Sequence, residues 1–135
     1  MKKIILLFGF DDLPGTQQAF ALGQLTSAMD VTVSRVGRES FHRTLISLLQ
    51  AAAGGENNPD AKKEPVSSPP EPLPARMLLF TGFSDTELYQ TLDLCTSCGI
   101  TRDDLKAALT PANSRWNARK LCENILEEHR QLRQG

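Results

Sequence analysis

Two cysteines separated by two residues, Cys95 and Cys98, have the spacing that most directly suggests chemistry. A Cys-x-x-Cys pair can form a redox couple or bind a metal, and a reactive pair lies at a helix N-terminus, where free amides stabilise the thiolate. This pair instead precedes Gly99, a residue typical of a helix C-terminus. We therefore favour packing of both side chains in the core and keep a thiol redox or metal-dependent protein as the alternative function.

The strongest candidate for binding is the segment 113–120, in which Asn113, Arg115, Trp116 and Arg119 surround an expected helix start. Unpaired amides at such a start favour an anion, and Arg115 and Arg119 are one helical turn apart. The only tryptophan of the chain offers a large amphipathic side chain of a kind often used at interfaces. The alternative is a capping Asn113, an Arg119 paired with Glu123, and a Trp116 that covers the sheet.

Two similar turns form a second candidate site. The residues Gly9-Phe10-Asp11-Asp12 and Gly82-Phe83-Ser84-Asp85 each follow a short apolar run. Ligands of open α/β sheets bind in crevices outside the carboxyl ends of strands, so one crevice shared by Gly9, Phe10, Gly82 and Phe83 is predicted. The same residue types are also what any turn from a strand to a capped helix requires.

Signals for an enzyme are absent from the sequence, which has no phosphate-binding loop, nucleophile elbow or zinc-protease motif. The third cysteine, Cys122, and the two histidines, His42 and His129, have no paired ligand spacing. The acidic pairs are adjacent in sequence, which turns their side chains in different directions on regular structure. We predict no catalytic residue, no metal site and no cofactor.

The elements that must position these residues repeat in two halves, residues 1–53 and 76–135. Each half has an apolar run, a helix, a second short strand (31–34 and, more weakly, 105–109) and a second helix. The predicted inward-facing stripes of the first helix of each half are Leu22, Leu25 and Met29, and Leu88, Leu92 and Cys95. The predicted N-terminal caps of the four helices are, in chain order, Asp12 or Thr16, Ser40, Ser84 in a capping box with Glu87, and Asn113 or Ser114. The first helix of the second half is predicted to stop at Gly99.

Two strands are not stable alone, so the two βαβα halves must share one four-stranded sheet in a single α/β or α+β domain. Helices on one face, in a ferredoxin-like layout, and helices on both faces remain open alternatives. Six of the eight prolines fall in residues 54–75, which lack apolar periodicity and are expected to form an extended, flexible tether. The six are Pro59, Pro65, Pro69, Pro70, Pro72 and Pro74.

Composition excludes several partners. The 15 basic and 16 acidic side chains give a net charge of −1, so the electrostatic attraction that dominates non-specific nucleic-acid binding is missing. The apolar run Ile4–Phe10 ends at Asp11-Asp12 without a cleavage site, and no stretch approaches the roughly 20 apolar residues that cross a bilayer. Three cysteines are too few for a secreted disulfide scaffold, so a cytoplasmic protein with reduced thiols is predicted.

The repeated turns and the segment Leu105–Trp116 resemble a family of small bacterial proteins known as domain of unknown function 3783. The resemblance is strongest over residues 77–129 and looser over 1–50. It implies a fold and a bacterial setting, and it implies no activity. We expect a non-enzymatic binding or regulatory module for a small anion or a protein partner. A hydrophobic face left open on the sheet or at Phe41 would indicate a homodimer.

Overall fold

The computed structural model describes residues 3–10, 12–54, 73–101 and 104–134. The predicted flexible tether lies almost entirely outside these residues. Within these ranges, four strands and four α-helices alternate, with two short 3₁₀ helices in the first half. In order they are β1 (Lys3–Phe8), α1 (Leu13–Leu25), η1 (Ser27–Met29), β2 (Val31–Val36), η2 (Arg38–Ser40), α2 (Leu45–Gly54), β3 (Met77–Thr81), α3 (Asp85–Ser97), β4 (Leu105–Ala108) and α4 (Ala118–Gln134).

The four strands form one sheet in the order β2-β1-β3-β4, which confirms that the two βαβα halves share a sheet. Within each half the strands are parallel, and the halves join where β1 runs antiparallel to β3. The register places Phe8 opposite Met77 and Ile4 opposite Thr81. The carboxyl ends of the strands of one half therefore lie at the same end of the sheet as the amino ends of the strands of the other.

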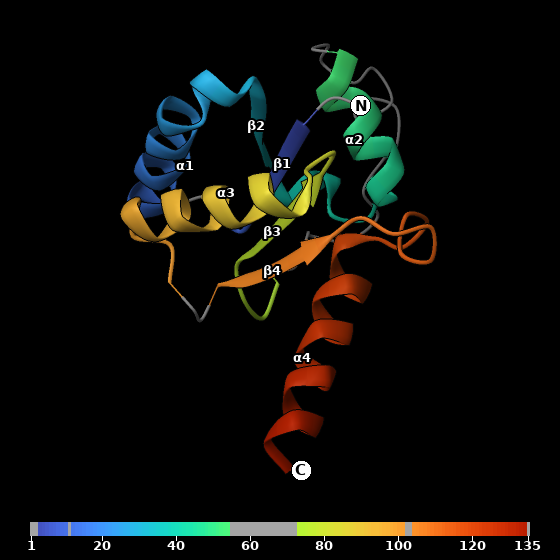
Figure 1. Ribbon diagram of the computed structural model, residues 1–135. Coiled ribbons are helices and arrows are strands. Elements are labelled where there is room, and N and C mark those ends of the chain that lie inside the picture. Colours follow the sequence, from blue (N-terminus) through green and yellow to red (C-terminus); the bar gives the residue numbers. More distant parts are fainter. Residues whose placement is uncertain (1–2, 11, 55–72, 102–103, 135) are drawn as a thin grey trace.

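Helices cover both faces of the sheet, which resolves the alternative left open by the sequence (Figure 1). Because side chains alternate along a strand, Ile4, Leu6 and Phe8 pack with α2 and α4, while Ile5 and Leu7 pack with α1 and α3. All five of these side chains are buried, as expected for a central strand covered on both sides.

The first helix of each half begins as predicted. The Asp12 side chain accepts a hydrogen bond from the Gly15 amide at 2.7 Å, and Ser84 and Glu87 form a reciprocal capping box. Gly99, with φ +89°, follows the last turn of α3 and stops it. The cap residues and the glycine stop act through neighbours in sequence, which is why the sequence predicts them.

The second helix of each half begins later than predicted. Thr44, not Ser40, caps α2 by accepting a hydrogen bond from the Ser47 amide at 3.3 Å. Asn117, not Asn113 or Ser114, caps α4 by accepting from the Lys120 amide at 2.9 Å. In both halves a tight turn occupies the residues where the helix was expected, because the backbones at Thr44 and Asn117 pair antiparallel with each other.

The predicted apolar stripe of α1 is wrong in part. Leu22 is buried, but Leu25 is 45% exposed and Met29 lies in η1 beyond the end of the helix. The helix ends at Leu25 with Thr26 as its C-cap, and after η1 the chain turns through Asp30, whose φ is +58°. In α3 the prediction holds, since Cys95 is buried and Leu88 and Leu92 pack against the same core.

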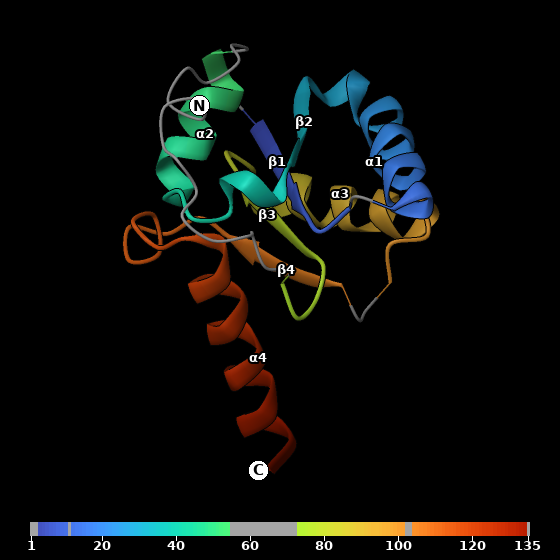
Figure 2. The same ribbon diagram turned by 180° about the vertical axis from the view of Figure 1, so that it is seen from behind.

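The last helix extends beyond the sheet. The first part of α4 is buried against the sheet through Ala118, Leu121, Cys122 and Ile125, whereas residues 127–131 of the same helix are exposed. Figure 2 shows the C-terminal part of α4 pointing away from the other elements, in agreement with the front view. Among the described residues, no helix has the length and apolar character needed to cross a membrane.

Candidate functional site

The two similar turns lie at opposite ends of the sheet. Since β1 and β3 are antiparallel, Gly9 and Phe10 follow β1 at one end, while Gly82 and Phe83 follow β3 at the other. The prediction of one crevice shared by both turns is therefore wrong. Both glycines have a positive φ, +84° and +85°, so the two turns are similar in conformation and are separate in space.

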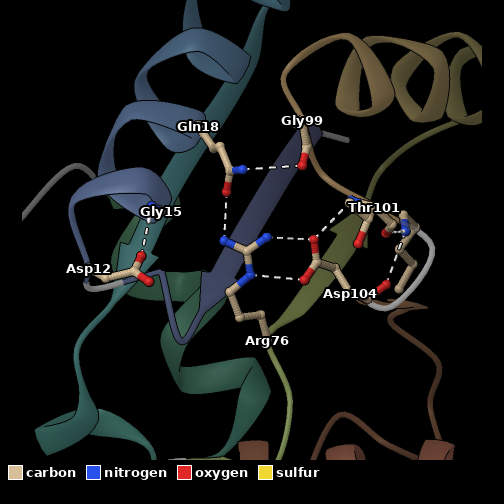
Figure 3. A network of polar contacts seen from close by, with 8 residues as sticks. Asp12, Gly15, Gln18, Arg76, Gly99, Thr101 and Asp104 are labelled. Carbon is tan, nitrogen blue, oxygen red and sulfur yellow. Dashed lines mark hydrogen bonds and ion pairs between the residues drawn. The ribbon is translucent and has the colours of Figure 1, made fainter.

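The turn at Phe10 lies against Arg76, which forms a polar junction with Gln18 of the first half and Asp104 of the second (Figure 3). Phe10 is buried, and the guanidinium of Arg76 stacks on its ring at 4.3 Å. Arg76 donates two hydrogen bonds to the Asp104 carboxylate, at 2.8 and 2.6 Å, and a third to the Gln18 side chain at 2.6 Å. Gln18 in turn donates to the Gly99 carbonyl at 3.2 Å.

Asp104 is 7% exposed and also accepts a hydrogen bond from the Thr101 amide at 3.0 Å. Burial acts to raise the pKa of this carboxyl, but the hydrogen bonds from Arg76 and Thr101 outweigh it, and the pKa lies below its usual value. The bidentate geometry and the satisfied oxygens are those of a structural ion pair. This junction holds α1 of the first half against the starts of β3 and β4.

Sequence reasoning missed Arg76 and Asp104. Arg76 directly precedes β3 and Asp104 directly precedes β4, and the parallel pairing of Met77 with Leu105 brings the two side chains side by side. The sequence does contain a signal for this ion pair, namely a basic residue before one strand and an acidic residue before the next. It predicts the pair only when those two strands are known to be neighbours.

At the other end of the sheet, Phe83 is half-buried and packs edge-on against Phe80, with 5.8 Å between ring centroids. Glu87, which belongs to the capping box, forms an ion pair with Lys3 of the first half. The hydrogen bond from Lys3, followed by those from Ser84, lowers the pKa of Glu87 to about 2. The Gly82 turn thus carries a cap and a second polar link between the halves.

Asn113 closes the turn that follows β4. Its side chain accepts from the Thr110 amide at 2.8 Å and donates to the Ala108 carbonyl at 3.1 Å, while its own amide donates to the Thr110 hydroxyl at 3.1 Å. The residue is 7% exposed. Because its donors and acceptors are used within the turn, Asn113 positions the following segment and is not itself presented to a ligand.

Arg115, Trp116 and Arg119 lie within five residues of one another, between this turn and the first turn of α4. Trp116 is half-buried against the core under α2 and α4, and the amine of Lys120 lies 4.9 Å from its ring centroid. Arg115 and Arg119 are exposed, and Arg119 approaches Glu123 at 3.8 Å, a distance and exposure at which an ion pair contributes little. The predicted pairing of Arg119 with Glu123 is thus present.

The first half contributes to the same surface. The amide of Leu45 donates to the Trp116 carbonyl at 2.8 Å, and the amide of Ile46 donates to the Ser114 carbonyl at 2.9 Å. Ile46 is 39% exposed although it is a large apolar residue. We call the surface made by Ile46, Arg115, Trp116, Arg119 and Lys120 the Trp116 surface.

The helix-start amides of α2 already have acceptors, and so does one of those of α4. The first three amides of α2 donate to the Trp116 and Ser114 carbonyls and to the Thr44 side chain, and in α4 the Lys120 amide donates to the Asn117 side chain. An anion bound as at an uncapped helix start would have to displace these hydrogen bonds. The Trp116 surface therefore offers charged and apolar side chains.

The cysteines are placed as core residues. Cys95 is fully buried, and burial, followed by the proximity of Cys98, raises the pKa of its thiol to about 11. Burial also raises the pKa values of the thiols of Cys98 and Cys122. A nucleophilic or metal-binding cysteine requires the thiolate, which these surroundings disfavour. Within the described ranges, no group of three or more His, Cys, Asp and Glu side chains could hold a metal ion.

The family model described as Domain of unknown function (DUF3783) matches residues 76–132. The match confirms the resemblance noted in the sequence over the second half. It begins at Arg76 and includes Asn113, Arg115, Trp116 and Arg119, whereas Gly9 and Phe10 lie outside it. No curated protein and no solved structure matches the chain.

Proposed function

We propose that this chain, which carries domain of unknown function 3783 over residues 76–132, is a non-enzymatic binding module of the bacterial cytoplasm. Its ligand is an acidic segment of a protein partner, bound on the Trp116 surface. The observation that carries the proposal is a half-buried tryptophan with the Lys120 amine over its ring and exposed Arg115 and Arg119 close by in sequence, on a backbone that both halves hold in place.

Side-chain chemistry favours an acidic protein segment over a small anion. Exposed Arg115 and Arg119 attract carboxylates, and Trp116 with Ile46 offers apolar area to a neighbouring aliphatic side chain. Arginine and tryptophan are the residue types enriched among the residues that dominate binding energy at interfaces. A small anion would gain most from free helix amides, and those of α2 are already hydrogen-bonded.

The single tryptophan gives a direct test, because all indole fluorescence comes from Trp116. The chain is titrated with a synthetic peptide of alternating glutamate and leucine, with the same peptide carrying glutamine, and with sodium phosphate. The proposal predicts an emission change with the glutamate peptide that weakens as salt is added. Exposed charge pairs contribute up to about 1 kcal/mol each, so Arg115→Ala with Arg119→Ala weakens binding by up to about thirtyfold.

The matched control is Arg130→Ala, which removes the same charge from the exposed part of α4. It should leave the peptide affinity unchanged. Equal loss in Arg130→Ala, or equal binding of the glutamine peptide, would contradict the proposal. Saturation by phosphate alone, lost in the Arg115→Ala and Arg119→Ala variant, would instead identify the ligand as a small anion.

A further inference from the structure

One side of α3 carries Asp85, Tyr89 and Asp93. These residues are four apart in sequence, so they follow one another along the same side of the helix. All three are exposed, and Tyr89 is 70% exposed although it is a large aromatic residue. Among the ion pairs of the described residues, none involves either aspartate. We call this set of three residues the acidic stripe.

The stability of α3 does not explain the whole acidic stripe. Asp85 lies in the first turn, where the helix dipole stabilises an acid, whereas Asp93 lies in the second half of the helix, where the dipole gives an acid no stabilisation. The helix contains no lysine or arginine, and α1, which covers the same face of the sheet, contains no charged residue at all. The two helices of this face therefore carry acidic groups and no basic ones.

The Trp116 surface has the complementary chemistry and belongs to the other face of the sheet. Trp116 packs against the core under α2 and α4, whereas α3 packs with α1 on the opposite side (Figures 1 and 2). The basic residues of the Trp116 surface are Arg115, Arg119 and Lys120. Because the sheet separates the two surfaces, one copy of the chain cannot bind its own acidic stripe.

We infer that the acidic stripe of one copy of this chain binds the Trp116 surface of a second copy. This inference rests on the proposed function and identifies its acidic protein segment as α3. Asp85 and Asp93 pair with the basic side chains, and Tyr89 supplies the apolar contact to the indole, since aromatic rings attract each other beyond the area they bury. The net charge of −1 lets two copies approach without strong repulsion.

The contact joins two different surfaces. Each bound pair of copies therefore keeps one acidic stripe and one Trp116 surface free, and assemblies grow beyond two copies as concentration rises. Sedimentation equilibrium of the full chain should show a weight-average mass that increases with concentration and decreases as salt is added.

Mixing two variants tests the inference most sharply. One variant carries Asp85→Asn and Asp93→Asn, and the other carries Arg115→Ala and Arg119→Ala. Each variant alone should associate with a dissociation constant raised by up to about thirtyfold. An equimolar mixture should regain the affinity of the unmodified chain but stop at two copies, because one intact acidic stripe meets one intact Trp116 surface.

The matched control is Glu127→Gln with Glu128→Gln, which removes two acidic charges from exposed positions of α4. The inference predicts unchanged association for this control. Tyr89→Ala should raise the dissociation constant about tenfold. Urea unfolding checks that every variant keeps its fold.

A mass that stays at one chain at every concentration would overturn the inference. So would an equal loss of association in the control, or a mixture that associates no better than either variant alone. The glutamate peptide separates this failure from failure of the proposed function, because the variant with Asp85→Asn and Asp93→Asn keeps its Trp116 surface and should still bind that peptide. Peptide binding without self-association would reject α3 as the bound segment and leave the proposed function standing.

Discussion

The two halves of the chain share one order of elements and differ in how each is finished. Both begin with a strand, a glycine turn with φ near +85° and a capped helix. The first half ends its side of the sheet at the six-residue strand β2, and the second ends at the four-residue strand β4, whose last carbonyl, that of Ala108, accepts a hydrogen bond from the Asn113 side chain. The second half also carries most of the Trp116 surface. The elements common to both halves form the sheet. We assign the binding of other molecules to the features in which the halves differ.

The largest expected effect comes from the junction between the halves. Arg76→Met keeps apolar contact with Phe10 but leaves the nearly buried carboxylate of Asp104 without its ion-pair partner. We expect a loss of about 3 kcal/mol in the free energy of unfolding, measured with urea. Arg119→Met, at an exposed pair, should change it by less than about 1 kcal/mol. Equal losses in the two variants would show that the Arg76–Asp104 ion pair stabilises the fold no more than an exposed pair does.

Replacing the glycine of each turn by alanine, and comparing the two losses of stability, tests whether the two turns are equivalent. Both Gly9 and Gly82 have a φ that L-residues avoid, so Gly9→Ala and Gly82→Ala should each cost about 1–2 kcal/mol. At Gly9 the added Cβ would lie 3.5 Å from the Arg76 backbone, an ordinary contact, so no further penalty is expected there. Thermal unfolding of the two variants provides the comparison. A loss at one turn only would show that the turns are not equivalent.

Acid should weaken both polar links. The pKa of Glu87 is lowered from 4.5 to about 2 by Lys3 and Ser84, and that of Asp104 lies below 3.8. A carboxyl with a lowered pKa in the folded state contributes stability above its unfolded pKa, and this is lost as pH falls through the folded value. The free energy of unfolding should therefore decrease from pH 5 to pH 2. Glu87→Gln should flatten this decrease, and an unchanged slope would contradict the role of Glu87.

The smallest expected effect concerns the thiols. Because burial raises the pKa of every cysteine, alkylation of the native chain by iodoacetamide at pH 7 should be slow, with half-buried Cys98 modified before Cys95 and Cys122. Mass spectrometry of digested samples gives the order. Rapid modification of Cys95 would revive the alternative of a thiol-based function.

Local signals in the sequence predicted local structure well. The caps at Asp12 and Ser84, and the stop at Gly99, depend on residues within one helical turn, so their types and spacing suffice. The shared sheet also followed, because neither half could be stable with two strands.

Features that depend on long-range pairing could not be predicted. Ser40 and Thr44 are both suitable caps, and the choice of Thr44 follows from its pairing with Asn117 of the other half. The separation of the Gly9 and Gly82 turns depends on the antiparallel contact of β1 with β3, which no local pattern shows. Arg115, Trp116 and Arg119 are close together in the sequence, so they could be found from it. Ile46 and the Arg76 junction could not, because they depend on contacts between distant parts of the chain.

Titration of Trp116 fluorescence with the glutamate peptide tests the central difference between the halves most directly, because the second half carries most of the Trp116 surface. The account predicts an emission change that saturates and that weakens as salt is added, both in the unmodified chain and in Arg130→Ala. Binding should be weaker in the variant that carries Arg115→Ala and Arg119→Ala. A change that is independent of salt, or equal binding by that variant and the unmodified chain, would contradict the account.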